Sequence, residues 1–278
     1  MELSRTFTPA TSRAPALRAK KGTPPEDKKS SARRTTATAR REFVAKRSAS
    51  GPISERAAPM DWFTRSTAAA EALKPPTSSM PLRELIALCK TIVTGYPILY
   101  GDGVISKILS DDMNGNVGRL EAAASELEKA APAGARPTLA DLLARRGAGG
   151  APPSPHDPGV YGARWVSRTL RFVALLLQQL AADPELSIAE AGRATYAAVI
   201  APYHMPVMAF VASFILRWAP RRSWVLANPL GGASNDAACA ACAALSGLVG
   251  PVAEAVAGAL AERGLDFTDR ISAIPGGW

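Results

Sequence analysis

Apolar residues recur at intervals of three and four along most of the chain from Met80 onward. A first stripe runs from Leu82 to Val93, and a second, from Val104 to Leu109, leads directly into Asp112 and Asn116. Such spacing places the apolar side chains on one face of an α-helix. The pattern therefore predicts two helices here, and it places the two polar residues at the end of a buried apolar face.

The same spacing predicts six further helices, over residues 120–130, 138–143, 164–182, 187–201, 207–218 and 235–263. Thr138 is a candidate N-cap, and Ser187 with Glu190 has the spacing of a capping box. Residues 146–159 are dense in Gly and Pro and predict a surface loop. No alternating strand pattern and no repeat is present, so the sequence predicts an all-α fold.

Prolines mark two expected interruptions of these helices. Pro202 and Pro206 flank the segment around His204, where we expect a kink or a break. A second interruption is expected near Gly250–Pro251 in the last helix.

The N-terminal segment, residues 1–60, lacks apolar periodicity and is rich in Ser, Thr, Arg, Lys, Ala and Pro, so we expect a disordered basic tail. Residues 1–59 hold 14 Lys+Arg against 5 Asp+Glu, which accounts for the net charge of +9 of the whole chain. The tail lacks the apolar core of a secretory signal and resembles a plastid or mitochondrial transit peptide, although Glu2 and Glu26–Asp27 are unusual there. We expect a cytoplasmic protein, with organelle import as the alternative.

The rest of the chain has no net charge, and it has few side chains suited to catalysis or metal binding. A basic field for nucleic acid is therefore not expected. Cys89, Cys239 and Cys242 are too few for a disulfide framework, and the last two form a CxxC in an Ala-rich run, where buried small residues are expected. With two histidines, His156 and His204, and no nucleophile–base arrangement, we expect neither an enzyme nor a metal or cofactor.

The apolar run Val199–Leu216 has 18 residues, near the lower limit for a membrane-spanning helix. It includes His204 and two prolines, so a soluble domain with a very apolar interior is the preferred interpretation. An interior of this kind with few aromatic residues is compatible with a cavity for aliphatic chains, but composition alone favours an ordinary helical core.

Asp112, Asn116 and Arg119 stand at positions i, i+4 and i+7 of the predicted helix, so a carboxylate, an amide and a guanidinium share one face. That face suits a polyol or a phosphate. On spacing alone, however, a solvated face is the preferred interpretation, and an ion pair between Asp112 and Arg119 or Arg168 is a further alternative.

Three later motifs follow this one in order: Trp165-Val-Ser-Arg168, Tyr203-His204 and Arg217-Trp-Ala-Pro220. Together with Asp112–Arg119 they resemble the glycolipid transfer protein family, over residues 80–265, with a C-terminal extension at 266–278. The resemblance implies a two-layer helical sandwich that carries one sphingolipid. The headgroup would lie at the surface and the hydrocarbon chains in an apolar tunnel. The protein, as a monomer in transient contact with membranes, would move the lipid without chemical change.

The resemblance also implies a headgroup site of six residues: Asp112, Asn116, Arg119, Trp165, Arg168 and His204. The acid and the amide would bind sugar hydroxyls, Trp165 would offer a flat face to a sugar ring, and His204 would donate to the ceramide amide carbonyl. The sequence departs from the family after His204, since relatives commonly have Gly-Trp or Pro-Trp where this chain has Met205-Pro206.

Trp165 favours a neutral glycosphingolipid, because Arg at this place accompanies ceramide 1-phosphate in the family. The two guanidinium groups also suit a phosphate or sulfate. The alternatives are therefore a ceramide 1-phosphate transfer protein, or a sphingolipid sensor or adaptor with the same pocket.

Overall fold

The structure, a computed structural model, describes residues 59–74, 76–145, 150–227 and 233–266. The chain divides into two units, and all of these residues belong to the second, Arg56–Trp278. The expected basic tail lies outside the described residues except for Pro59 and Met60, and the expected C-terminal extension is described only at Asp266.

Helices account for the regular structure of these residues, apart from an isolated β-bridge between Pro81 and Thr138, which confirms the all-α prediction. The elements are α2 (Pro59–Glu71), α3 (Leu82–Val93), α4 (Gly95–Tyr100), α5 (Val104–Ala130), α6 (Leu139–Ala144), α7 (Pro158–Ala182), α8 (Ile188–Val199), the 3-10 helix η3 (Ala201–Tyr203), α9 (Pro206–Arg217), α10 (Arg222–Ala227) and α11 (Asn235–Ala261).

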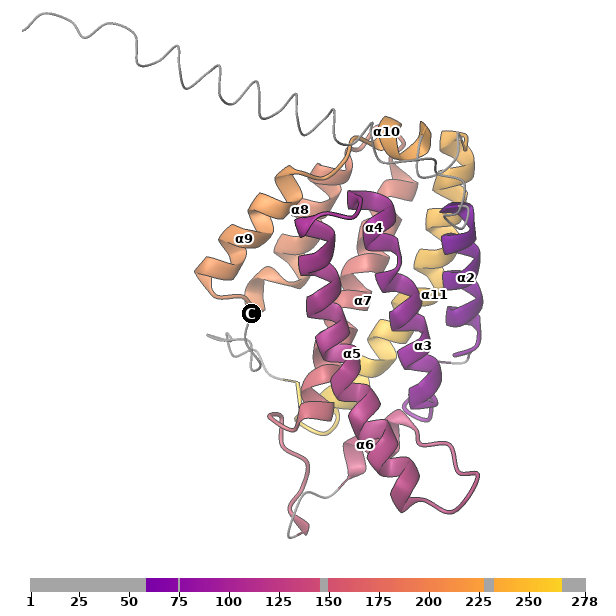
Figure 1. Ribbon diagram of the computed structural model, residues 1–278, viewed down its shortest axis with the longest axis vertical. Coiled ribbons are helices and arrows are strands. Elements are labelled where there is room, and N and C mark those ends of the chain that lie inside the picture. Colours follow the sequence, from indigo (N-terminus) through magenta and orange to yellow (C-terminus); the bar gives the residue numbers. More distant parts are fainter. Residues whose placement is uncertain (1–58, 75, 146–149, 228–232, 267–278) are drawn as a thin grey trace, which may run out of the picture. The chain divides into compact units, whose positions relative to one another are not determined.

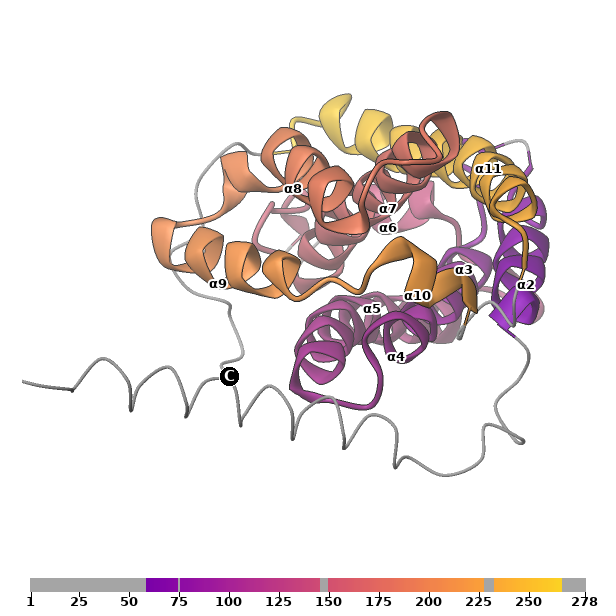
Figure 2. The ribbon, with the colours of Figure 1, turned by 90° about the horizontal axis from the view of Figure 1, so that it is seen from above.

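The longer helices form two layers (Figures 1 and 2). One layer contains α3, α4 and α5, and the other contains α7, α8 and α11. The contact between α7 and α11 is the most extensive, followed by that between α5 and α7, which joins the layers. In both views α2 lies on one side of the bundle and α9 on the opposite side.

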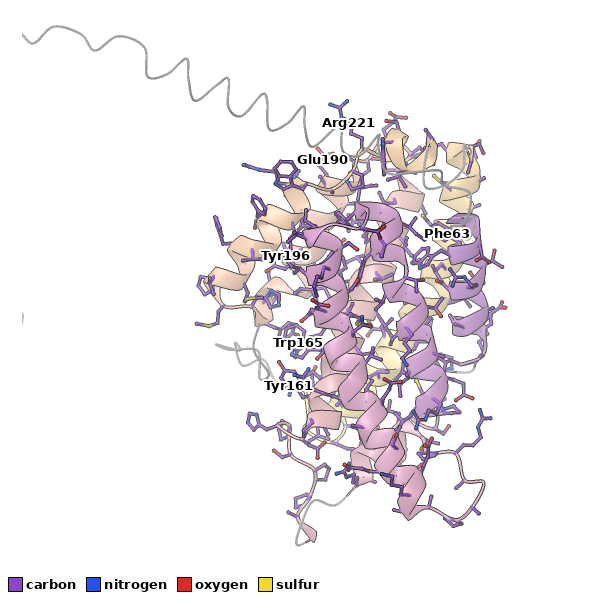
Figure 3. All side chains as sticks on the ribbon, in the orientation of Figure 1. Phe63, Tyr161, Trp165, Glu190, Tyr196 and Arg221 are labelled. Atoms are coloured by element: carbon purple, nitrogen blue, oxygen red, sulfur yellow. The ribbon has the colours of Figure 1, made fainter. Side chains whose placement is uncertain are left out.

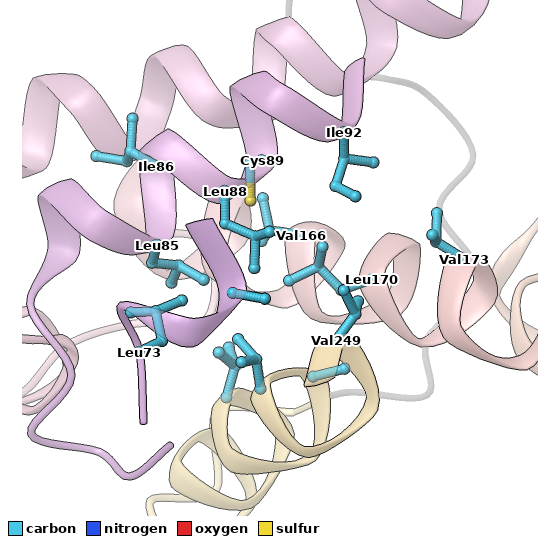
Figure 4. Close-up of a cluster of buried hydrophobic side chains, with 14 of the residues drawn as sticks. Leu73, Leu85, Ile86, Leu88, Cys89, Ile92, Val166, Leu170, Val173 and Val249 are labelled. Carbon is cyan, nitrogen blue, oxygen red and sulfur yellow. The ribbon is translucent and has the colours of Figure 1, made fainter. Parts of the chain in front are cut away.

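The core between the layers is built by the predicted apolar stripes (Figure 4). Leu85, Leu88 and Ile92 of α3 are buried with Leu170 of α7 and Val249 of α11. Because residues at these intervals share a helix face, each helix contributes a continuous apolar surface to one common core.

The capping signals fix several helix starts. Thr138 and Asp141 form a capping box at α6, and Ser187 and Glu190 form one at α8, as predicted. The start of α7 is earlier than predicted, at Pro158 instead of Arg164, because the Asp157 side chain accepts hydrogen bonds from the first helical amides and proline suits the first turn.

The expected interruption near Gly250–Pro251 is wrong, because α11 continues through Pro251. An interior proline costs a helix about 3 kcal/mol by removing a hydrogen bond and crowding the preceding turn. The long contact of α11 with α7 outweighs this cost, since Val249, Val252 and Ala253 on either side of the proline are buried.

The break around His204 is confirmed: α8 ends at Val199, η3 follows, and α9 begins at Pro206. The apolar run Val199–Leu216 is therefore not one helix. Among the described residues, α11 alone has the length and apolar composition of a membrane-spanning helix, and core helices pass the same test.

Candidate lipid-binding site

A cavity of about 510 Å³ lies between the layers and reaches α9. Its walls come from α2, α3, α4, α5, α7, α8 and α9, and from Ile200 and His204 on either side of η3. Most of the lining side chains are apolar, among them Ile92, Leu99, Ile108, Leu109, Phe172, Leu176, Leu177, Ile188, Ile200, Met208, Val211, Ile215 and Leu216. The polar groups on the lining include Asp112, Asn116, Tyr161, Tyr196 and His204. This is the arrangement of a site for an amphipathic molecule with long apolar parts.

Asn116 is the buried member of the polar face on α5. Its amide Nδ2 donates to the backbone oxygen of Asp112 at 3.0 Å, and its Oδ1 accepts from Arg119 Nη1 at 3.1 Å. The α7 backbone approaches closely at Gly162, where a Cβ would lie 2.7 Å from the Asn116 carbonyl oxygen. Glycine at 162 thus lets α7 bring its site residues against α5.

Asp112 combines access to water with a largely protein environment. Its side chain is exposed and lines the cavity. Burial nevertheless raises the pKa of its carboxyl, and the charge of Arg119 opposes the increase. A carboxyl group that is accessible to water and yet closely surrounded by protein is expected at the mouth of a cavity, and we place Asp112 there. Asp112 forms no salt bridge within the described part of the chain, so its oxygens are available to hydrogen-bond donors of a ligand.

Trp165 and His204 face each other across the boundary between α7 and the segment after η3. Their ring centroids are 5.5 Å apart with planes 35° apart, and both rings line the cavity. Trp165 is only 9% exposed, so its ring is more covered than an open sugar platform. Its indole N–H is buried and makes no hydrogen bond of standard geometry with the described residues, although it interacts with the Tyr161 hydroxyl closely enough to lower the pKa of that group against the effect of burial. A buried donor without such a bond costs about 1 to 3 kcal/mol, which an acceptor on a ligand would relieve.

His204 is oriented by Tyr196, whose hydroxyl lies 3.0 Å from Nδ1. Burial, and to a lesser degree the charge of Arg168, lowers the pKa of His204. The imidazole is therefore neutral at pH 7. When the tyrosine donates to Nδ1, the proton of the ring resides on Nε2, which can then donate to a carbonyl oxygen.

The two arginines of the predicted site, Arg119 and Arg168, are not among the residues that line the cavity. Arg119 bonds to Asn116 and places its guanidinium carbon 5.1 Å from the centre of the Tyr161 ring. Arg168 is buried and forms a salt bridge of 2.9 Å with Asp266. Burial lowers the pKa of Arg168, and Asp266 opposes the shift.

Arg168 also lies over two aromatic rings of the site. Its guanidinium carbon is 3.5 Å from the centre of the Tyr203 ring and 5.1 Å from that of Trp165. Stacking on the two rings and the salt bridge to Asp266 together hold the Arg168 guanidinium just behind the cavity wall. Asp112, Asn116, Trp165 and His204 are thus brought to the cavity, and the two arginines support it from behind.

Sequence reasoning missed several residues of the site. Tyr161 and Tyr196 line the cavity, and Figure 3 shows them with Trp165 on the side of the bundle nearest α8 and α9. Asp266 was also missed. The tyrosines could have been noticed as polar aromatic residues on otherwise apolar helix faces, whereas the partner of Arg168 lies too far away in sequence to be inferred.

The described residues offer no cluster of three or more His, Cys, Asp or Glu suited to a metal ion. The three cysteines are free thiols; Cys89 and Cys242 are buried, and Cys239 is partly buried. Cys239 Sγ accepts from Arg222 Nη2 at 3.0 Å and donates weakly to the backbone oxygen of Leu180. The CxxC thus serves the packing of α11 on its neighbours.

An apolar cavity with a polar mouth, inside two layers of helices, defines the class of helical lipid-binding proteins. The family model of the glycolipid transfer proteins matches residues 80–229, more than half of the chain, so the protein belongs to the glycolipid transfer protein family. This agrees with the resemblance carried by the four sequence motifs. No curated protein sequence matches the chain.

Solved structures of this fold are similar to the chain at low identity. Human ceramide-1-phosphate transfer protein bound to 12:0 ceramide-1-phosphate has a TM-score of 0.58 and 19% identity, over 73% of this chain and 96% of its own. The fungal glycolipid transfer protein HET-C2 has a TM-score of 0.58 and 15% identity, over 75% and 100%. A mutant of Arabidopsis accelerated-cell-death 11 with C12 ceramide-1-phosphate has a TM-score of 0.57 and 18% identity, over 73% of this chain and 97% of its own. These likenesses establish the fold.

Proposed function

We propose that the protein transfers a sphingolipid with a neutral sugar headgroup between membranes and leaves the lipid chemically unchanged. The hydrocarbon chains would occupy the apolar cavity and the headgroup its polar mouth. Each methylene moved from water into such a cavity contributes about 0.8 kcal/mol, so the chains dominate affinity and the polar groups decide which lipid binds.

The charge of the cavity wall is the observation that favours a neutral headgroup. Asp112 is the only Asp, Glu, Lys or Arg among the described residues that line the cavity. A phosphate placed beside this carboxylate would meet a like charge in a partly desolvated place. Sugar hydroxyls can instead donate to it. The indole N–H of Trp165 and the amide of Asn116 complete a set of donors and acceptors suited to a polyol.

Ceramide 1-phosphate is the second candidate ligand, and a specific observation favours it. The guanidinium of Arg168 lies directly behind Trp165, so a small rearrangement away from Asp266 would present it to a phosphate. Two of the similar solved structures named above were determined with ceramide-1-phosphate bound.

Helix α9 suits transient contact with a membrane. Met208, Val211 and Ala212 line the cavity from one side of the helix, while Phe210 is 73% exposed and Phe214 53% exposed. Large apolar side chains exposed on the outer side of a helix that lines the cavity indicate another apolar phase as partner. Arg217 and Arg221 at its C-terminal end are exposed and complement anionic lipid.

The proposal is tested by transfer between vesicles of glucosylceramide and ceramide 1-phosphate with the same acyl chain. We expect faster transfer of glucosylceramide. Asp112→Val should slow it by about tenfold or more, because the sugar hydroxyls that the bound lipid places against Asp112 lose their acceptor, and a hydrogen bond lost from a covered site costs roughly 1 to 3 kcal/mol.

Asp111→Val is the matched control, since Asp111 is the neighbouring acid and forms an exposed ion pair with Lys107. It should leave transfer within a factor of about two, as surface ion pairs contribute little. Faster transfer of ceramide 1-phosphate by the wild-type protein would overturn the neutral-headgroup proposal, and transfer of neither lipid would overturn the transfer function.

A further inference from the structure

The cavity reaches a residue that precedes the part of the chain matched by the family model. Trp62, on α2, is buried and lines the cavity, whereas the match begins at residue 80. Of the described side chains of α2, Trp62 alone is on the lining, and Ile92, Gly95 and Tyr96 of the following helices line the cavity as well. Helix α2 therefore contributes a single large side chain to the wall.

The indole of Trp62 is held in place from several sides. Its N–H donates to the backbone oxygen of Thr91 at 3.0 Å, and Phe63 packs edge-on with ring centroids 4.9 Å apart. The ring also lies close against Gly95, where a Cβ would be 2.7 Å from Cε2. A ring fixed by a hydrogen bond and by close packing does not yield readily to a ligand.

Helix α2, which carries Trp62, lies away from α9 (Figures 1 and 2). Helices α2 and α9 occupy opposite sides of the bundle in both views (Figures 1 and 2), and Figure 3 shows Phe63, the neighbour of Trp62, on the side opposite to Trp165. Beyond the indole, α2 packs against α3 and α11. The indole contacts Phe63, which belongs with Leu73 and Leu85 to the filled core. Among the described residues, α11 contributes nothing to the lining, so we take the indole as the limit of the cavity on this side.

We propose that Trp62 is the end stop of the hydrocarbon tunnel and sets the longest chain that the protein accepts. The inference rests on the proposed sphingolipid function and adds the residue that selects chain length. A chain that reaches past the indole has to break the bond to Thr91 and push the ring into Phe63 and the core. A chain that stops short of it leaves unfilled space, which also costs binding energy.

The test is competition among glucosylceramides with acyl chains of graded length, with the bound lipids identified by native mass spectrometry of the full chain. Trp62→Ala should shift the preferred acyl chain to greater length. Within the space that the indole vacates, each further buried methylene should raise relative occupancy by about fourfold. Trp62→Leu, which keeps an apolar side chain and perturbs folding less, should give a smaller shift in the same direction.

Gly95→Ala supplies a change of opposite sign. The added Cβ must displace the indole, and displacement toward the cavity shortens the preferred chain. Phe63→Leu is the matched control, because Phe63 is the adjacent buried aromatic residue on α2 and is not part of the lining. It should lower the melting temperature while leaving the preferred chain length unchanged.

The outcomes separate the two proposals. Absence of any bound sphingolipid in the wild-type protein would overturn the proposed function. If the wild type binds these lipids and both Trp62 variants keep its chain-length profile, the proposal that Trp62 limits chain length is wrong. The proposed sphingolipid function would be unaffected by that result. A profile that changes equally in Phe63→Leu would also overturn the end stop, because the change would then reflect a loosened α2.

Discussion

The two walls of the cavity are built differently. The inner wall, formed by α5 and α7, is supported by α3 on one side and α11 on the other through extensive contacts. The outer wall consists of α8, α9 and the segment around η3, which lines the cavity through Ile200 and His204. Helix α9 has its main contact with α8 and buries only Ile215 and Leu216, whereas α7 buries residues along most of its length.

This difference separates recognition from access. Asp112, Asn116 and Trp165 belong to the inner wall, where dense packing fixes their geometry. The outer wall has few buried apolar contacts, so its local opening requires less free energy than opening of the core. We therefore expect substitutions in the inner wall to change which lipid binds, and substitutions in the outer wall to change how lipid enters and leaves.

The strongest test of this distinction is removal of the exposed aromatic residues of α9. Phe210→Ser combined with Phe214→Ser should weaken binding to anionic vesicles on the order of 100-fold, since burying one such side chain contributes about 1.5 to 3 kcal/mol. Transfer should fall with it, while occupancy by a short-chain lipid in detergent stays unchanged. Vesicle co-sedimentation and native mass spectrometry measure the two quantities.

Ser213→Ala is the control on the same helix, because Ser213 is exposed and its hydroxyl donates a hydrogen bond to the backbone oxygen of Ala209 within the same helix. Undiminished vesicle binding by the double variant would show that α9 is not the membrane contact. Loss of lipid occupancy in detergent would instead show that the outer wall contributes to recognition, contrary to the distinction.

A smaller effect is expected at Arg168, which belongs to the inner wall and stacks on Tyr203 of the outer wall. Asp266→Asn removes the negative charge that neutralises this guanidinium. The ratio of ceramide 1-phosphate to glucosylceramide transfer should rise about three- to tenfold, because a phosphate can then act as the counter-ion.

Glu262→Gln is the matched charge control, since Glu262 is an exposed acid just beyond the end of α11. It should leave the ratio of the two lipids unchanged. An equal rise in both variants would mean that net charge at the membrane, and not the Arg168–Asp266 pair, controls the ratio.

Local patterns in the sequence predicted the inner wall well. Apolar residues spaced by three and four identified α3 and the start of α5, and that register placed Asp112 and Asn116 together at the cavity. Capping residues located the starts of α6 and α8 because a cap is a contact between residues three apart. Such information lies within one or two helical turns and is therefore present in a short stretch of sequence.

Features that depend on contacts between distant residues were not predicted. Asp266 reaches Arg168 from 98 positions away, so spacing could not reveal that this guanidinium is neutralised and removed from the lining. Helix α11 passes through Pro251 because its contact with α7 compensates the local cost. Likewise, α2 preceded the residues assigned to the fold, and Trp62 has a role only through Thr91 and Gly95.

The smallest expected effect is the pH dependence of stability at the junction of the walls, where His204 meets Trp165, Tyr196 and the charge of Arg168. Burial lowers the pKa of His204 in the folded protein below the ordinary value of about 6.5. As the pH falls below this value, the unfolded chain takes up the proton more readily, so the free energy of unfolding decreases until the pH passes the folded pKa. Above the ordinary value this contribution is constant.

His204→Gln should flatten the pH dependence of the free energy of unfolding between pH 7 and pH 5 in thermal unfolding experiments. Tyr196→Phe should alter this dependence less, because it removes only the hydrogen bond to Nδ1 of His204. An identical slope in the wild type and His204→Gln would show that the junction tolerates a charged imidazole, and the outer wall would then be less closely fitted to Trp165 than the structure implies.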